Sequence, residues 1–402
     1  IALELAIKEK LIFGEEIVFT WGPLAFLTTC LDIYKSKFLI ILFHIFHSIN
    51  VIYFFFIVFK KFEDKKFLLI IYTVLLIYGN LLFAKVPICF YFISIFQMFH
   101  FLSRPNIFSL LIITIYSSLG VFIKVDFSFI LFITLNVFLI YNLVYKKKKI
   151  KIHLLFYFLT YALIAVQAYF LNVNFLAYLK NSTYIINYYN DSMTIIPSLY
   201  FQQGICLFIL LLLAISLFWN IKSLEKLKKE GFLIFNLAII TYLTFKYGFV
   251  RNDFQHSKIF LAFSVFNFIF FLIFSKSIIP FKKEIFSIIC ILSLAGQTES
   301  YLGKTEKHIR AQINEENTNN SQFLNKNILT KIKNESVDFL GSSISFIHYN
   351  NLKYNPRPVI QSYSAYSKEL IDLNSKKYES SSAPSFILHE FEQFDNRIPY
   401  WN

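Results

Sequence analysis

Glycine and cysteine are scarce in this sequence, and both scarcities limit what the protein can be. The 402 residues include 10 glycines and 4 cysteines. The polar C-terminal part contains no glycine-rich phosphate-binding loop and no G-x-S-x-G nucleophile motif. The cysteines are scattered and form neither a disulfide framework nor a metal-ligand spacing: Cys30, Cys89, Cys206 and Cys290. We therefore expect no cofactor, although a divalent cation held by carboxylates stays an open alternative.

Acidic residues are also few. The chain has 25 Asp and Glu against 39 Lys and Arg, which gives a formal net charge of +14. Such an excess is typical of nucleic-acid-binding proteins. Here, however, most lysines lie in short breaks between apolar runs, where membrane topology accounts for them. We therefore expect no nucleic-acid partner.

Apolar residues are abundant, at 56% of the chain with 51 phenylalanines, whereas soluble domains contain about 45–50%. Runs of nearly 20 apolar residues match the roughly 30 Å hydrocarbon core of a bilayer. The runs are continuous and lack the alternation of an outer-membrane barrel. The sequence thus predicts an all-α polytopic membrane domain over residues 38–297. About ten transmembrane helices are expected, at 38–59, 67–84, 86–102, 107–123, 127–145, 152–170, 203–219, 232–247, 259–275 and 284–297.

The charge of the breaks predicts the orientation of these helices. Alternate breaks hold 17 and 6 Lys or Arg residues, and the richer set is expected in the cytoplasm. Residues 1–37 and the C-terminal tail then lie outside. Because residues 1–37 precede a helix that runs inward, a further helix is expected upstream of Ile1.

The tail is predicted to be a linker, residues 298–326, followed by a small α/β soluble domain, residues 327–402. Three strands are expected, within "VDFLG", "RPVIQSY" and "APSFILHEF", with an amphipathic helix at 367–380 capped by Ser367. Strand–helix–strand order favours a partly parallel sheet. Arg357 lies in the rigid stretch "NPRPV", where both a structural anchor and an anion contact are open roles.

Four segments on the expected outer side carry unusual chemistry. They are "FGEEIVFTWGPLAFL" with Glu15 and Glu16, "FIKVDF" with Lys124 and Asp126, a loop expected at 171–202, and "FKYGFVRNDFQH". The last holds Lys246, Arg251, Asp253 and His256. Local ion pairs, a solvated loop and an aromatic belt at the membrane surface would explain these residues without any function.

Convergence of the same segments would form a binding site instead. Arginine binds phosphate in a bidentate manner, and a carboxylate at the membrane boundary can act as a general base. His256 adds an imidazole to the same segment. A cationic outer cleft between helices suits a lipid whose phosphate lies at headgroup level.

Three histidines, His44, His47 and His100, lie within apolar runs. His44 and His47 are three residues apart on one predicted helix, a spacing that metal sites use. No third ligand is near in sequence, so we expect packing roles for them.

Several of these motifs resemble signatures of a family of uncharacterised bacterial multi-pass membrane proteins with an outer α/β tail. The motifs are "FGEEIVFTWGPLAFL", "FKYGFVRNDFQH" and "YNPRPVIQSYSAYSKELIDLN...APSFIL". That family resembles, more loosely, the class C glycosyltransferases, which take sugars from polyprenyl-phosphate carriers at the outer face. In that class an acid in the first outer loop is the base, a cation contacts the donor phosphate, and a soluble tail covers the site.

The resemblance implies a bacterial inner-membrane enzyme whose partners are a lipid-linked sugar donor and membrane lipid. Expected catalytic residues are Glu15, Glu16 and Asp253, although the catalytic acid can also lie upstream of Ile1. Expected substrate-binding residues are Lys124, Asp126, Lys246, Arg251, His256 and Arg357. Two alternatives stay open: a lipid or glycan transporter, which predicts polar residues at mid-bilayer depth, and a non-catalytic envelope scaffold.

Overall fold

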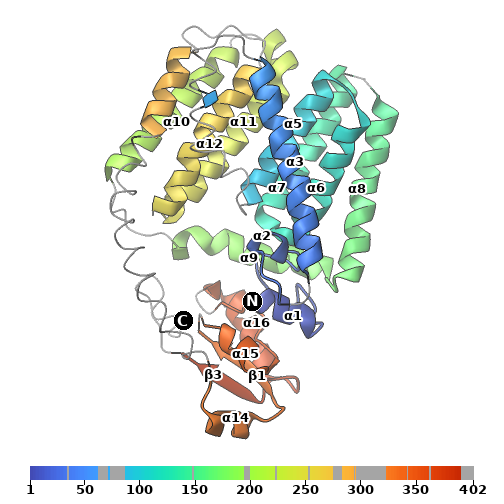
Figure 1. Cartoon of the computed structure of the whole chain (residues 1–402), viewed down its shortest axis with the longest axis vertical. Coiled ribbons are helices and arrows are strands. Elements are labelled where there is room, and N and C mark those ends of the chain that lie inside the picture. Colours follow the sequence, from blue (N-terminus) through green and yellow to red (C-terminus); the bar gives the residue numbers. More distant parts are fainter. Residues whose placement is uncertain are drawn as a thin grey trace.

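A bundle of apolar helices and a small α/β unit make up the structure (Figure 1). The computed structural model describes residues 1–33, 36–61, 71–72, 87–146, 149–193, 200–221, 224–251, 254–274, 283–293, 295, 323–341, 343–361 and 364–390. The named elements of the bundle are α3 (Lys37–Lys61), α5 (Pro87–Ser103), α6 (Ile107–Ile123), α7 (Val125–Tyr141), the π-helix η1 (Asn142–Lys146), α8 (Ile150–Phe170), α10 (Tyr200–Ile221), α11 (Leu224–Arg251) and α12 (Phe254–Phe274).

Several of these helices have the length and composition of membrane spans. Five stretches qualify: Lys37–Lys61, Ser128–Tyr145, Ile150–Phe170, Glu230–Val250 and His256–Phe274. Three apolar helices are shorter: Ile88–Ser103, Ile107–Ile123 and Gln203–Ile215. The prediction of a mostly helical chain with several candidate membrane-spanning helices is confirmed. The predicted count of about ten spans is not, and most of the run expected at 67–84 lies outside the described residues.

Aromatic packing fills the centre of the bundle. Phe92 of α5 contacts Phe54 of α3 edge-to-face at 5.3 Å between ring centroids, and Phe263 of α12 at 5.8 Å. Both geometries are the ones that ring quadrupoles favour. The many phenylalanines therefore hold neighbouring helices together in an environment that provides no hydrophobic driving force between them.

The region expected to be a loop at 171–202 contains a helix, α9 (Phe175–Met193). Asn174 caps its start, because its side chain accepts a hydrogen bond from the Ala177 N–H at 3.3 Å. In Figure 1, α9 crosses the end of the bundle, between the long helices and the α/β unit. The loop prediction was wrong because polar residues that suggested a loop, such as Asn181, lie on a helix face that contacts the N-terminal segment.

The α/β unit contains a three-stranded sheet in the order β2-β1-β3, and both pairs are parallel. Its strands are β1 (Ser336–Leu340), β2 (Lys353–Tyr354) and β3 (Phe386–His389), and its helices are α14 (Lys326–Ile332), α15 (Ser345–Tyr349) and α16 (Lys368–Glu379). Strands in "VDFLG" and "APSFILHEF" and a helix capped by Ser367 are confirmed. The strand expected in "RPVIQSY" is absent from the described residues 357–361. The sheet uses Lys353–Tyr354 instead, since Pro358 cannot donate to a ladder.

The N-terminal segment joins the α/β unit to the bundle. It contains two short helices, α1 (Ala2–Lys8) and α2 (Phe26–Thr29). Leu5 lies in the same apolar core as Val337 and Phe339 of β1. Further along, the Val18 N–H donates to the carbonyl of Pro358 at 2.8 Å. Residues 1–33 thus pack against the tail from one side and reach the membrane helices from the other.

Candidate functional site

A break in the helical backbone at Lys124 is the origin of the site. Lys124 is extended, with φ −155° and ψ 117°, and separates α6 from α7. Thr20 and Gly22 pair with the break: the Gly22 N–H donates to Ile123 at 3.1 Å, and the Val125 N–H donates to Thr20 at 2.8 Å. These bonds satisfy backbone groups that the break would otherwise leave unpaired.

Gly22 allows this close approach. A Cβ at position 22 would lie 2.4 Å from the Phe122 carbonyl oxygen and 2.5 Å from the Tyr178 hydroxyl. The Tyr178 hydroxyl donates to the Val121 carbonyl at 3.2 Å, so it cannot easily move away. Burial raises the pKa of this phenol, and the negative charge of Asp126 adds to the shift. The "TWGP" motif is therefore held against the helix break by buried, uncharged groups, namely the Phe122 backbone and the Tyr178 phenol.

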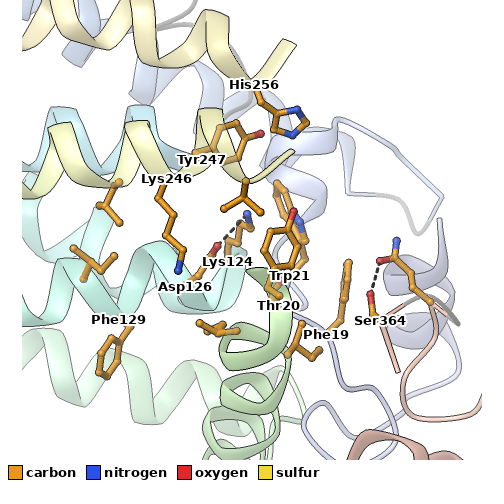
Figure 2. A pocket seen from close by; sticks show the side chains of 17 residues that line it. Phe19, Thr20, Trp21, Lys124, Asp126, Phe129, Lys246, Tyr247, His256 and Ser364 are labelled. Atoms are coloured by element: carbon orange, nitrogen blue, oxygen red, sulfur yellow. Dashed lines mark hydrogen bonds and ion pairs between the residues drawn. The ribbon is translucent and has the colours of Figure 1, made fainter. Parts of the chain in front are cut away.

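A cavity of about 420 Å³ opens beside the break (Figure 2). Its walls come from six parts of the chain: the N-terminal segment, the start of α7, α9, α11, α12 and the α/β unit. The apolar part of the wall comprises Phe19, Phe129, Ile130, Ile185, Ile186, Leu243 and Val250. The polar part comprises Thr20, Trp21, Lys124, Asp126, Tyr189, Lys246, Tyr247, His256, Gln361 and Ser364. Such an amphipathic lining suits a ligand with a charged head and an apolar body.

The charged groups gather at one part of this cavity. Lys124 Nζ lies 3.2 Å from Asp126 Oδ2, and it also lies 5.2 Å from the centre of the Trp21 ring, a cation–π distance. Figure 2 shows the Lys246 side chain extending from α11 into the cavity toward this pair. Among the described residues, Lys246 has no ion-pair partner. Two ammonium groups therefore accompany one carboxylate.

Four predicted substrate-binding residues thus meet in one cavity: Lys124, Asp126, Lys246 and His256. The His256 ring packs on Tyr247, with 4.9 Å between ring centroids. The segment that contains Lys246 and His256 is far from Lys124 in sequence, so their meeting supports the expected convergence.

Two predicted residues of the same segment cannot be placed. Arg251 is the last residue of α11, but its side chain is not among the groups that the structure describes. Asp253 lies outside the described residues. Their expected roles stay predictions.

Glu15 and Glu16 do not line the cavity. Glu15 accepts a hydrogen bond from the Asn174 amide at 2.5 Å, and Glu16 accepts one from the Ile12 N–H at 2.9 Å. Both carboxylates thus stabilise the fold of the N-terminal segment and its contact with α9. The carboxylate that the described residues bring to the cavity is Asp126, which sequence reasoning had placed among the binding residues.

Arg357 also lies elsewhere. Its guanidinium is 2% exposed and lies 2.9 Å from the Asp338 carboxylate, and it donates further to the carbonyls of Phe339 and Ile360. Burial lowers the pKa of Arg357, but Asp338 and the nearby phenols of Tyr378 and Tyr354 raise it by more in sum. Of the two roles left open by the sequence, the structure supports the structural anchor.

Sequence reasoning missed part of the wall. Gln361 and Ser364 come from the α/β unit, and Tyr189 comes from α9. Trp21 also lines the cavity, although it was not among the residues predicted for the site. The resemblance implied that a soluble tail covers the site, but it named Arg357 and not Gln361 or Ser364 as the tail's contribution.

Within the described part of the chain, no group of three or more His, Cys, Asp or Glu side chains is arranged to hold a metal ion. Comparisons with family models, curated proteins and solved structures gave no match. The geometry of the cavity is therefore the basis for inferring a function.

Proposed function

We propose that the cavity binds the phosphate of a lipid-linked sugar and that the protein transfers this sugar to an acceptor hydroxyl. The observation that carries the proposal is the amphipathic cavity, with two lysines and one carboxylate, at one end of a membrane helix bundle. We further propose that this end faces outward from the bacterial inner membrane, as the charge of the breaks predicts.

In this proposal the phosphate lies between Lys124 and Lys246, and the lipid tail follows the apolar wall toward the bilayer. Phe129, which is 61% exposed, marks the side where α7 meets lipid. Charge-assisted hydrogen bonds contribute about 1.5–3 kcal/mol each. Cations already in position also stabilise the negative charge that grows on a leaving phosphate.

Asp126 is the proposed general base. It accepts the proton of the acceptor hydroxyl as the acceptor oxygen bonds to the anomeric carbon, and the bond from that carbon to the phosphate oxygen breaks. The electron pair leaves with the lipid phosphate, beside the two lysines. Tyr189, Gln361 and Ser364 supply polar groups of the kind that bind sugar hydroxyls.

Binding of a polyprenyl phosphate tests the first step. We expect Lys246→Gln to weaken binding of the purified protein to a polyprenyl phosphate at least tenfold, because one charge-assisted contact is lost. Binding of the uncharged polyprenol should not change. Lys246 is suited to this test because its removal separates no described ion pair.

Lys180→Gln is the matched control, since Lys180 is exposed on α9 and does not line the cavity. Equal affinity of the wild type for the phosphate and the alcohol would refute the phosphate site. Tight phosphate binding without consumption of a polyprenyl-phosphate sugar would instead favour a transporter.

A further inference from the structure

The bundle contains a second set of polar groups, separate from the cavity. Helix α3 carries polar side chains at intervals of three residues: His44, His47, Asn50 and Tyr53. Each contacts a polar group from another segment. We call these four residues and their partners, Cys30, Gln97, His100, Ser109 and Tyr116, the polar column.

The contacts lie at four successive depths. His44 Nε2 lies 3.1 Å from Cys30 Sγ, near the end of the bundle where α2 packs. Next, His47 Nδ1 lies 2.8 Å from the Tyr116 hydroxyl. Deeper again, the Gln97 amide donates to Asn50 at 3.1 Å, and Ser109 donates to Gln97 at 3.0 Å.

The fourth contact lies near the C-terminal end of α5. Tyr53 Oη lies 2.8 Å from His100 Nε2. One turn later, the Arg104 N–H donates to the His100 carbonyl at 2.8 Å, where α5 has ended. Since a helix rises about 1.5 Å per residue, His44 to Tyr53 covers roughly 14 Å of depth.

The polar groups in the middle of the column are buried inside the helix bundle. His47 and Gln97 are each 1% exposed, and Asn50 is 3% exposed. Burying polar groups in a membrane bundle costs free energy unless they are paired, and ionisable ones there commonly lie on ion or proton routes. Ser94 shares a face of α5 with Gln97, and its buried hydroxyl has no partner among the described residues, so a water can bind there.

We propose that the polar column is a proton pathway between the two ends of the helix bundle. Each imidazole can accept a proton on one ring nitrogen and release one from the other, which leaves the residue unchanged. In this pathway the Tyr116 phenol exchanges a proton with His47, and the Tyr53 phenol exchanges one with His100. Water bound beside Asn50, Gln97 and Ser109 would connect the two pairs. The transmembrane proton gradient drives the flow, so no redox partner is required.

Proton flux into vesicles tests the proposal. The full-length protein is reconstituted in phosphatidylethanolamine and phosphatidylglycerol vesicles that contain a pH-sensitive dye, and a potassium diffusion potential is applied. We expect acidification at least tenfold faster than in protein-free vesicles. His47→Gln and His100→Gln should each reduce the rate to that of protein-free vesicles.

His153→Gln is the matched control. His153 is equally buried and lies 2.7 Å from the Asn142 amide, but it belongs to α8 and not to the column. Its variant should conduct like the wild type. Tyr116→Phe provides a second probe that keeps the ring packing if His47→Gln does not fold, and it should slow the flux.

Two results would overturn the proposal. Wild-type flux equal to that of protein-free vesicles would mean that no pathway exists. Variants that melt at lower temperature but conduct normally per folded molecule would mean that the column only holds α3, α5 and α6 in register, as interhelical hydrogen bonds do.

Discussion

Arg357 shows how much one residue's role depends on its neighbours. Arg357 forms a buried pair with Asp338. The Asp338 carboxylate also accepts hydrogen bonds from the Arg357 backbone N–H at 3.2 Å and from the Tyr378 hydroxyl at 2.6 Å. Removing one partner of such a pair leaves a buried charge uncompensated and costs about 3–5 kcal/mol.

Arg357→Met should therefore destabilise the α/β unit by about 3–5 kcal/mol, measured by denaturant unfolding. Lys376→Met is the control, because Lys376 is exposed on α16, and it should change stability by less than about 0.5 kcal/mol. An unchanged unfolding midpoint for Arg357→Met would mean that the pair does not anchor the unit and would reopen the anion-contact role.

The sequence indicated which residues line the cavity better than it indicated what each residue does. Lys124, Asp126, Lys246 and His256 were identified because charges between apolar runs are costly and need a reason. Arg357, Glu15 and Glu16 were predicted as site residues for the same reason, but their contacts stabilise the fold. A sequence shows that a charge is present, whereas only packing decides whether a neighbour neutralises it.

At the scale of elements, the pairing of the "TWGP" segment with the broken helix is the feature on which the cavity depends. Gly22→Ala would place a methyl group against the Phe122 carbonyl and the Tyr178 hydroxyl. Overpacking of this kind costs about 1–3 kcal/mol. Because Trp21 and Lys124 line the cavity beside this contact, polyprenyl-phosphate binding should weaken together with the melting temperature.

Gly204→Ala is the natural comparison, since a Cβ there meets nothing within 4 Å. In the middle of a helix, alanine is favoured over glycine, so this variant should melt at the same or a slightly higher temperature. If Gly22→Ala behaves like Gly204→Ala in melting and binding, the close approach at Gly22 is not needed for the site.

Helices with a clear hydrophobic periodicity were predictable from the sequence. Elements that form only through contacts with distant segments were not. The apolar helices and α16 follow from periodicity and a serine cap. Helix α9 was missed because its polar face contacts the N-terminal segment: Asn181 of α9 donates to the Gly14 carbonyl at 2.8 Å. The two-residue strand β2 is visible only once β1 is beside it.

For the whole molecule, three sequence-distant parts converge on one end of the bundle. The α/β unit reaches α9 through Tyr366, whose hydroxyl donates to the Ile185 carbonyl at 2.5 Å, and it reaches the N-terminal segment through Pro358. Val18, Ile185, Val359 and Leu370 form one small apolar core at this junction. The α/β unit thus helps to hold α9 and the N-terminal segment in place around the cavity.

The other end of the bundle carries basic breaks. Lys60 and Lys61 end α3, and Lys149 Nζ donates to the Pro105 carbonyl at 3.0 Å, beside the start of α6. Helix α9 lies at the opposite end of the same helices (Figure 1), and its residues Ile185, Ile186 and Tyr189 line the cavity. The positive-inside rule then assigns Lys149 to the cytoplasm and Lys180 of α9 to the outside.

Cysteine labelling in spheroplasts tests this assignment. The parent chain carries Cys30→Ser, because Cys89, Cys206 and Cys290 are buried and Cys30 is not. A membrane-impermeant maleimide should label Lys180→Cys in intact spheroplasts, and Lys149→Cys only after permeabilisation. Both positions are exposed, so access and not burial decides the result. The opposite pattern would place the cavity in the cytoplasm, where an outward-facing lipid-linked sugar cannot reach it, and the proposed transfer reaction would have to be abandoned.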